Sequence, residues 1–178
     1  MKERHWKYKD SLQLESGQII EDLDITYHIS GEDKIGQKPV VWICHALTAN
    51  SNAAEWWPGL VGPGKCYDPA DYIIICANVL GSCYGTTGPQ SINPASGTPW
   101  LRDFPLVSVR DMVACHILLS RHLGIDRIHT LIGGSIGGFQ AMEWAIMEPH
   151  AVEHLIAIVS GSHATPWAIA INEAERMA

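Results

Sequence analysis

Residues 132–138, Ile-Gly-Gly-Ser-Ile-Gly-Gly, constrain the fold of this chain more than any other stretch. Gly133, Ser135 and Gly137 match G-x-S-x-G, the pattern of a sharp strand-to-helix turn that presents a nucleophilic serine. Glycine on both sides of the serine permits the close backbone approach that such a turn requires. The alternative is a glycine-rich turn for packing or for phosphate, but neither G-x-G-x-x-G nor G-x-x-x-x-G-K-[ST] fits these residues.

The flanks of this segment supply the context that the turn needs. Residues 128–132 are apolar and rich in β-branched side chains, which predicts a buried parallel strand. Residues 139–148 predict a helix that Pro149 stops. This order points the Ser135 hydroxyl toward a helix N-terminus, where unpaired N–H groups favour developing negative charge. We therefore predict that Ser135 is a catalytic nucleophile.

Continuous apolar runs predict the sheet, and they cover residues 39–44, 72–77, 128–132 and 155–159. Because helical or loop segments separate these runs, they indicate an α/β fold with a parallel sheet covered on both faces. Upstream, the alternating segments 12–14 and 23–29 are separated by a turn signal at 16–18. They predict an antiparallel hairpin at the edge of the sheet.

The clearest helix is predicted over residues 108–123. Ser108 and Asp111 have the spacing of a capping box, and Gly124 supplies a stop. Its apolar stripe consists of Met112, Cys115, Leu119 and Leu123. In the helix after the glycine-rich turn, the small residues Gly138, Ala141 and Ala145 predict close packing against the sheet.

Two long connections, residues 45–71 and 79–105, follow the carboxyl ends of predicted parallel strands, where open α/β sheets bind ligands. A serine on such a turn needs two backbone N–H groups that hold an oxyanion. One comes from the residue after the serine and one from the loop after the third strand. Counting the hairpin as two strands, we assign these donors to Ile136 and Leu47. The alternative for Leu47 is an apolar anchor of its loop.

The net charge of −7 argues against nucleic acid or an anionic membrane as the main partner. No apolar run approaches the length of a membrane span. Residues 1–6 are charged and lack the apolar segment of a secretory signal. A cytoplasmic protein is therefore expected.

The five cysteines form no C-x-x-C pair. Cys44, Cys76 and Cys115 lie in apolar runs and are expected to be buried, reduced thiols, whereas Cys83, in a glycine-rich loop, is the one candidate for reactivity. The nine histidines show no metal-ligand spacing, so no metal site is expected.

Several stretches together resemble one family, homoserine O-acetyltransferase. They are His-Ala-Leu-Thr at 45–48, Trp-Trp-Pro at 56–58, Val-Gly-Pro-Gly-Lys at 61–65, residues 78–89 with Gly-Thr-Thr-Gly-Pro at their end, Ser-Ile-Asn-Pro at 91–94, residues 133–138, and Asn172, Glu173 and Arg176. The resemblance covers nearly the whole chain. It implies an α/β-hydrolase fold, here a single partial domain over residues 1–178.

The resemblance also implies a reaction. Members of the family transfer an acetyl group from acetyl-CoA to the hydroxyl of L-homoserine in methionine biosynthesis. Ser135 would attack the thioester and carry the acetyl group, while the Leu47 and Ile136 N–H groups hold the oxyanion. Acetyl-CoA is then a substrate and no cofactor is permanently bound. The partners are small molecules, and the full-length protein is expected to form a homodimer.

The chain departs from the family pattern in two ways. Ile136 stands where a methionine or leucine commonly follows the nucleophile, which a backbone donor tolerates. No aspartate follows Ser135, and the histidines after it are His150, His154 and His163. Since this fold orders its triad as Ser, Asp, His, the triad Asp and His are expected beyond Ala178, with the cap and the last strands.

Three alternatives to this acetyltransferase remain open. The chain is a non-catalytic fragment or binding module, since it lacks the triad Asp and His. It is a serine esterase or thioesterase, since the same turn and oxyanion donors suit water as acceptor. Or it is a family member specific for a succinyl donor or for serine as acceptor.

Overall fold

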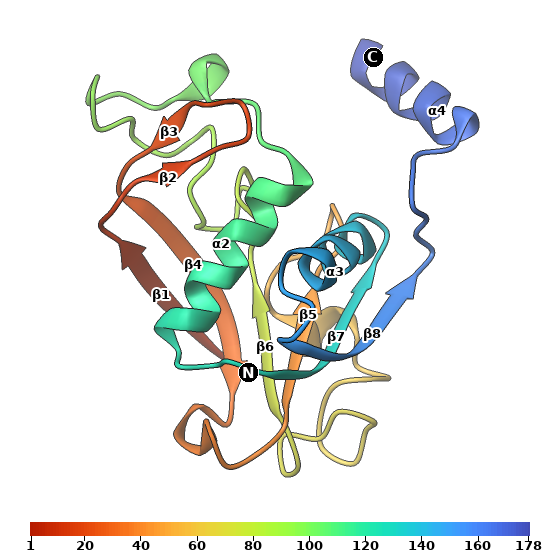
Figure 1. Ribbon diagram of the computed structural model, residues 1–178. Helices are drawn as coiled ribbons and strands as arrows, with labels where there is room; N and C mark the ends of the chain where they lie inside the picture. Colours follow the sequence, from red (N-terminus) through yellow and green to blue (C-terminus); the bar gives the residue numbers. More distant parts are fainter.

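The computed structural model describes all residues from 1 to 178. Its main sheet has six strands in the spatial order β1-β4-β6-β5-β7-β8 (Figure 1). The strands are β1 (Lys2–Tyr8), β4 (Leu23–Ser30), β5 (Val40–Cys44), β6 (Ile73–Ala77), β7 (Ile128–Gly134) and β8 (Val152–Ile158). Strands β5 to β8 are parallel, whereas β4 is antiparallel to both β1 and β6. The prediction of a mostly parallel α/β sheet with antiparallel strands at its N-terminal edge is confirmed.

The predicted hairpin of residues 12–14 with 23–29 is wrong in its pairing. Strand β4 pairs along its length with β1, which the sequence did not indicate. The short β2 (Leu12–Gln13) pairs instead with β3 (Ile19–Ile20) in a separate two-stranded sheet. The residue pattern does not predict β1, because its sequence is Lys-Glu-Arg-His-Trp-Lys-Tyr and only its aromatic side chains pack against the core. Backbone pairing with β4, rather than an apolar pattern, defines it.

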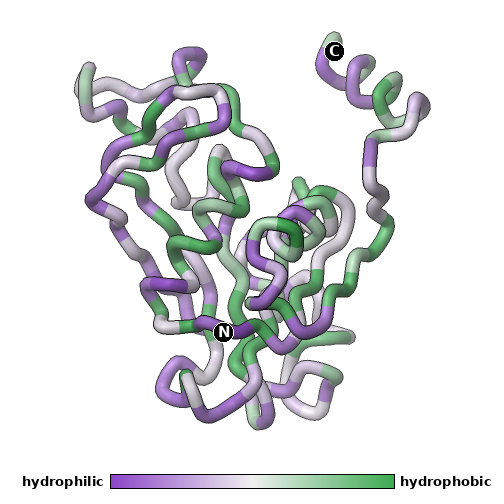
Figure 2. The backbone as a smooth tube through the Cα atoms, viewed as in Figure 1, coloured by the Kyte–Doolittle hydropathy of each residue, from purple (hydrophilic) through white to green (hydrophobic).

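The three central strands are buried on both faces. Every residue of β5 and β6 is buried, and so is most of β7. One face packs against α2 (Val109–His122) and α3 (Ile136–Met147), which lie in front of the sheet in Figure 1. The other face is covered by the connection after β5, including the short α1 (Ala53–Trp56). Figure 2 shows hydrophobic residues concentrated along these strands, as continuous apolar runs predict.

Helix α2 begins as predicted with a capping box. The Ser108 side chain accepts a hydrogen bond from the Asp111 N–H, and the Asp111 carboxylate accepts one from the Ser108 N–H. Of the predicted stripe, Cys115 and Leu119 are buried, and His116 and Ile117 join them in the core. Helix α3 begins at Ile136 and not at Phe139, because the helix starts directly at the sharp turn. Two short 3₁₀ helices cover Glu32–Lys34 and Leu101–Asp103.

The last two elements are exposed, against the expectation that residues 155–159 form a buried strand. Strand β8 pairs with β7 on one side only, and all of its residues after Val152 are exposed. A continuous apolar run does not reveal whether its strand has neighbours on both sides. Helix α4 (Pro166–Met177), capped by Thr165, contributes no buried residue and stands apart from the sheet in Figure 1. No helix of the structure is both long and apolar enough to cross a membrane.

A buried imidazole links α2 to α3. His116 donates from Nε2 to Oε1 of Gln140 at 2.9 Å, because the Gln140 amide nitrogen is itself a donor to the Ile136 carbonyl. The His116 ring stacks on Trp144, and Trp42 packs edge-on against both. The second ring nitrogen, Nδ1, has no hydrogen-bond partner, so a proton there would place an unpaired charge in the core.

This buried histidine predicts acid sensitivity. Burial lowers the pKa of His116 from 6.5 to about 4. Between these values the unfolded chain binds a proton that the folded chain does not. The contribution of neutral His116 to the free energy of unfolding is therefore complete above pH 6.5. It is lost as the pH falls toward 4, by about 3 kcal/mol in all. Urea unfolding across this range should show a smaller loss for His116→Gln than for the wild type. His150→Gln, at an exposed position, should follow the wild type, and identical pH profiles for all three proteins would contradict the assignment.

Candidate active site

Ser135 lies where β7 passes into α3, in a strained backbone conformation. Its φ of 56° and ψ of −125° are rare for any residue other than glycine, and its side chain is exposed. A Cβ at Gly133 would lie 2.0 Å from the Gly137 carbonyl oxygen, and a Cβ at Gly137 would lie 2.0 Å from that of Cys44. The glycines of the motif are thus required by backbone contacts on both sides of the serine. The Ser135 hydroxyl makes no hydrogen bond to the protein and is open to a reactant.

The two residues assigned as oxyanion donors both present free backbone N–H groups. Ile136 is the first residue of α3, and its N–H has no acceptor in the protein. Leu47 lies in the loop after β5, with 71% of its surface exposed, and its N–H is also unpaired. This exposure does not fit the alternative of an apolar loop anchor. The contact between Gly137 and the Cys44 carbonyl brings the start of α3 and the start of this loop together.

His45 fixes the loop that carries Leu47, a role that the sequence did not indicate. The imidazole is 1% exposed, and its Nε2 accepts a hydrogen bond from the Val79 N–H at 3.2 Å. Its Nδ1 therefore carries the proton and donates to the Ala46 carbonyl at 2.8 Å. Burial lowers the pKa of His45, so the ring stays neutral and ties the connection after β5 to the one after β6.

The segment Gly-Thr-Thr-Gly-Pro at 85–89 anchors the second long connection to β4. The Thr86 hydroxyl accepts from the Thr26 N–H at 3.1 Å, and the Thr87 hydroxyl accepts from the Asp24 N–H at 2.8 Å. Gly85 has a φ of 90°, and a Cβ there would lie 2.6 Å from the Thr26 hydroxyl. These contacts fix the path of the loop along β4.

The three histidines after Ser135 and the five cysteines make no hydrogen bond to Ser135. His150, His154 and His163 are exposed, and none of them hydrogen-bonds to Ser135. The thiols of Cys44, Cys76 and Cys115 are buried as predicted, and burial raises the pKa of each above its ordinary value. Cys83 is exposed and free, and so is Cys66.

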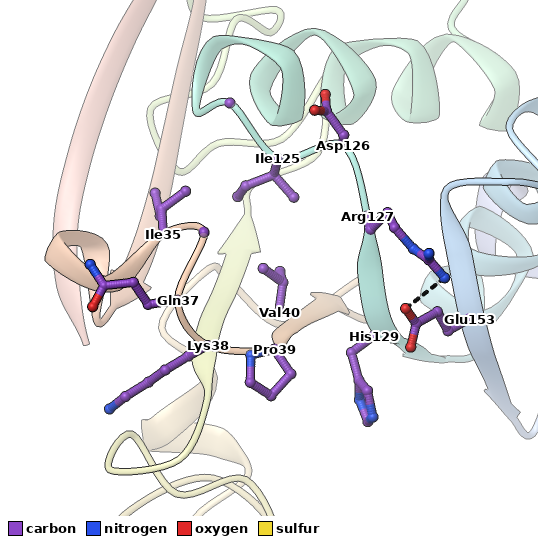
Figure 3. A pocket seen from close by; sticks show the side chains of 12 residues that line it. Ile35, Gln37, Lys38, Pro39, Val40, Ile125, Asp126, Arg127, His129 and Glu153 are labelled. Atoms are coloured by element: carbon purple, nitrogen blue, oxygen red, sulfur yellow. Dashed lines mark ion pairs between the residues drawn. The ribbon is translucent and has the colours of Figure 1, made fainter.

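A cavity of about 400 Å³ lies at the opposite end of the sheet, between residues 35–40 and 124–129 (Figure 3). Beside it, His129, Glu153 and His154 each place a ligand-type atom within 4.8 Å of the others. These residues come from two strands, so their sequence spacing did not indicate the group. Arg127 lies 2.8 Å from the Glu153 carboxylate and competes with any cation for it. We assign no metal to these residues.

An exposed serine on a strained turn between a parallel strand and a helix, followed by a residue with a free N–H group, defines a class of protein. A family model described as alpha/beta hydrolase fold matches residues 39–178. The chain belongs to the alpha/beta hydrolase fold family.

The relatives of this chain carry a narrower name than the fold family. Proteins named homoserine O-acetyltransferase from Cyclobacterium marinum and Chlorobaculum tepidum are 42% and 44% identical, over 96% and 98% of this chain and 48% and 49% of their own lengths. The chain spans about half the length of the curated relatives it matches. The identity to these relatives confirms the resemblance to homoserine O-acetyltransferases.

Solved structures agree on the fold. The crystal structure of an esterase has a TM-score of 0.88 and 28% identity, covering 97% of this chain and 51% of its own. That of homoserine O-acetyltransferase from Bacillus anthracis has a TM-score of 0.84 and 31% identity, covering 93% of this chain and 48% of its own.

Proposed function

We propose that this protein is an acyltransferase that moves an acetyl group from acetyl-CoA to the hydroxyl of L-homoserine. The observation that carries the proposal is the exposed Ser135 on its strained turn, followed by the unpaired N–H group of Ile136. The unpaired N–H group of Leu47 belongs to the loop whose first residues meet the start of α3. The names of the relatives support the acceptor and the acetyl group. The free, buried thiols support a reducing compartment such as the cytoplasm.

The proposed reaction has two steps. The Ser135 oxygen forms a bond to the thioester carbonyl carbon and gives its proton to a base. The oxyanion accepts hydrogen bonds from the two N–H groups, and coenzyme A leaves as the thiol when the proton passes to its sulfur. In the second step the homoserine oxygen bonds to the same carbon, its proton returns through the base, and Ser135 is released. None of the three histidines after Ser135 contacts it, so we assign no base among these residues.

Hydrolysis is the second candidate. It is supported by the likeness to the esterase structure, which has a TM-score of 0.88 and 28% identity. The same acyl-serine would then be cleaved by water, and the two activities differ only in the acceptor of the second step.

Product analysis separates these candidates. The full-length gene product is incubated with acetyl-CoA, with and without L-homoserine. We expect release of coenzyme A in a burst, an acetyl group on Ser135 by mass spectrometry, and O-acetylhomoserine when the acceptor is present. Free acetate at the same rate with and without homoserine would establish the hydrolase instead. An unmodified Ser135 after incubation with acetyl-CoA would reject both.

A further inference from the structure

The end of β8 is bound to both backbone polar groups of the strained serine. The Ser135 N–H donates to the Ile158 carbonyl at 3.0 Å. Two residues further on, the Ser160 hydroxyl donates to the Ser135 carbonyl at 2.7 Å. The same hydroxyl lies 3.1 Å from the Ile158 carbonyl, so its single proton is directed at the closer acceptor, Ser135.

Two unusual features hold the Ser160 hydroxyl in this place. Val159 has a φ of 52° although it is β-branched and 90% exposed, so no packing of its own side chain explains the conformation. The backbone bend at Val159 directs Ser160 back toward the strained turn at Ser135. On the other side, a Cβ at Gly138 would lie 1.9 Å from the Ser160 oxygen, so only glycine leaves room for the hydroxyl.

The carbonyl that Ser160 binds belongs to the same peptide group as the Ile136 N–H. A peptide is planar, so a hydrogen bond to its oxygen also fixes the direction of its N–H. Hydrogen bonds in series polarise one another, so a donor at the oxygen makes the N–H a stronger donor in turn. The series of hydrogen bonds therefore runs from the Ser160 O–H, through the peptide group that joins residues 135 and 136, to any oxyanion that accepts from the Ile136 N–H.

We propose that Ser160 is a positioning residue of the oxyanion hole, which orients and strengthens the Ile136 N–H without touching the substrate. The inference rests on the proposed function, because it takes this N–H as an oxyanion donor. The Ser135 carbonyl also accepts from the Gly138 and Phe139 N–H groups of α3, at 2.9 and 3.2 Å. Loss of the Ser160 hydroxyl therefore leaves no unpaired carbonyl, and the fold does not depend on it.

Ser160→Ala tests this role, with Ser162→Ala as the matched control in the same exposed loop. Ser162 contacts only His163 through its hydroxyl. In the full-length gene product, we expect Ser160→Ala to slow acylation of Ser135 by acetyl-CoA about 2- to 8-fold, because the bond is present before the reaction and only its strengthening of the Ile136 N–H toward the oxyanion changes the rate. The KM for acetyl-CoA should stay within about twofold, because the bond acts on the transition state. Ser162→Ala should match the wild type in both quantities.

A second readout does not depend on activity. In NMR spectra the amide proton of Ile136 should move upfield in Ser160→Ala and stay in place in Ser162→Ala. An unmoved Ile136 amide, or equal acylation rates in both variants, would overturn the role of Ser160. Loss of the fold in Ser160→Ala would overturn it as well, since the proposal requires a dispensable hydroxyl. If the wild type forms no acetyl adduct but the Ile136 amide still moves, the bond is real and the proposed function is the part that fails.

Discussion

Replacing Ser135 by alanine is expected to lower the proposed acetyl transfer by about 10⁴-fold or more, the largest effect on activity that this structure predicts. The substitution removes the only hydroxyl that stands exposed on the strained turn. Coenzyme A release and acetyl labelling are measured on the full-length gene product beside Ser162→Ala, which should keep full activity. An acetyl adduct on the Ser135→Ala variant at the wild-type rate would show that another residue carries the acyl group.

The same position allows the backbone strain to be measured. Alanine has a Cβ and keeps the strain of a φ of 56° at this position, whereas glycine adopts this conformation freely. We expect Ser135→Gly to be as inactive as Ser135→Ala but more stable, by about 1 to 3 kcal/mol. Urea unfolding of the two variants gives this difference directly. If Ser135→Gly is less stable than Ser135→Ala by the roughly 0.5 to 1 kcal/mol that glycine ordinarily costs through its freer unfolded chain, the turn holds no strain.

Gly137→Ala is expected to have the largest effect on stability. A glycine-to-alanine change inside a helix ordinarily stabilises by roughly 0.5 to 1 kcal/mol. Here the added Cβ would lie 2.0 Å from the Cys44 carbonyl oxygen and 2.9 Å from that of His45. Both are backbone atoms that no side-chain rotation can move, so α3 must shift away from β5. We expect the free energy of unfolding to fall by more than about 3 kcal/mol.

Gly134→Ala is the matched control for this change. Its Cβ would meet only the Ile158 carbonyl oxygen at 3.8 Å, an ordinary contact, and its φ is not positive. Urea unfolding followed by circular dichroism should place this variant within about 1 kcal/mol of the wild type. If both variants are equally stable, the close approach of α3 to β5 is not as tight as the structure describes.

The parts of the fold that could be predicted from the sequence are those whose local pattern and tertiary environment agree. β5, β6 and β7 are continuous apolar runs because both faces of the sheet are covered, and the residue pattern alone reveals this. The capping box of α2 is likewise a local signal. β1 is not predicted from the sequence, because only its pairing with β4 defines it. β8 is predicted as a buried strand but is exposed, because it pairs on one side only and the residue pattern does not reveal this.

The candidate site also contains residues that a local motif predicts and residues that it does not. Ser135 and its glycines follow a short motif whose geometry is fixed by backbone contacts, so their arrangement could be predicted. His45 is hydrogen-bonded to Val79, which lies 34 positions away in the sequence, and Ser160 to Ser135, which lies 25 positions away. No local spacing encodes such contacts. The roles of Leu47 and Ile136 as oxyanion donors remain predictions, and their unpaired N–H groups are consistent with them.

The exposed apolar surface of β8 and α4 affects how the stability of this chain should be measured. Ile156, Val159, Trp167 and Ile169 face water in this 178-residue chain. Dyes that fluoresce on hydrophobic surfaces will therefore bind before any unfolding, and a dye-based melting curve will start from a high baseline. Of the seven tryptophans, Trp42 and Trp144 are each at most 1% exposed, so their share of the indole emission follows the loss of the core itself.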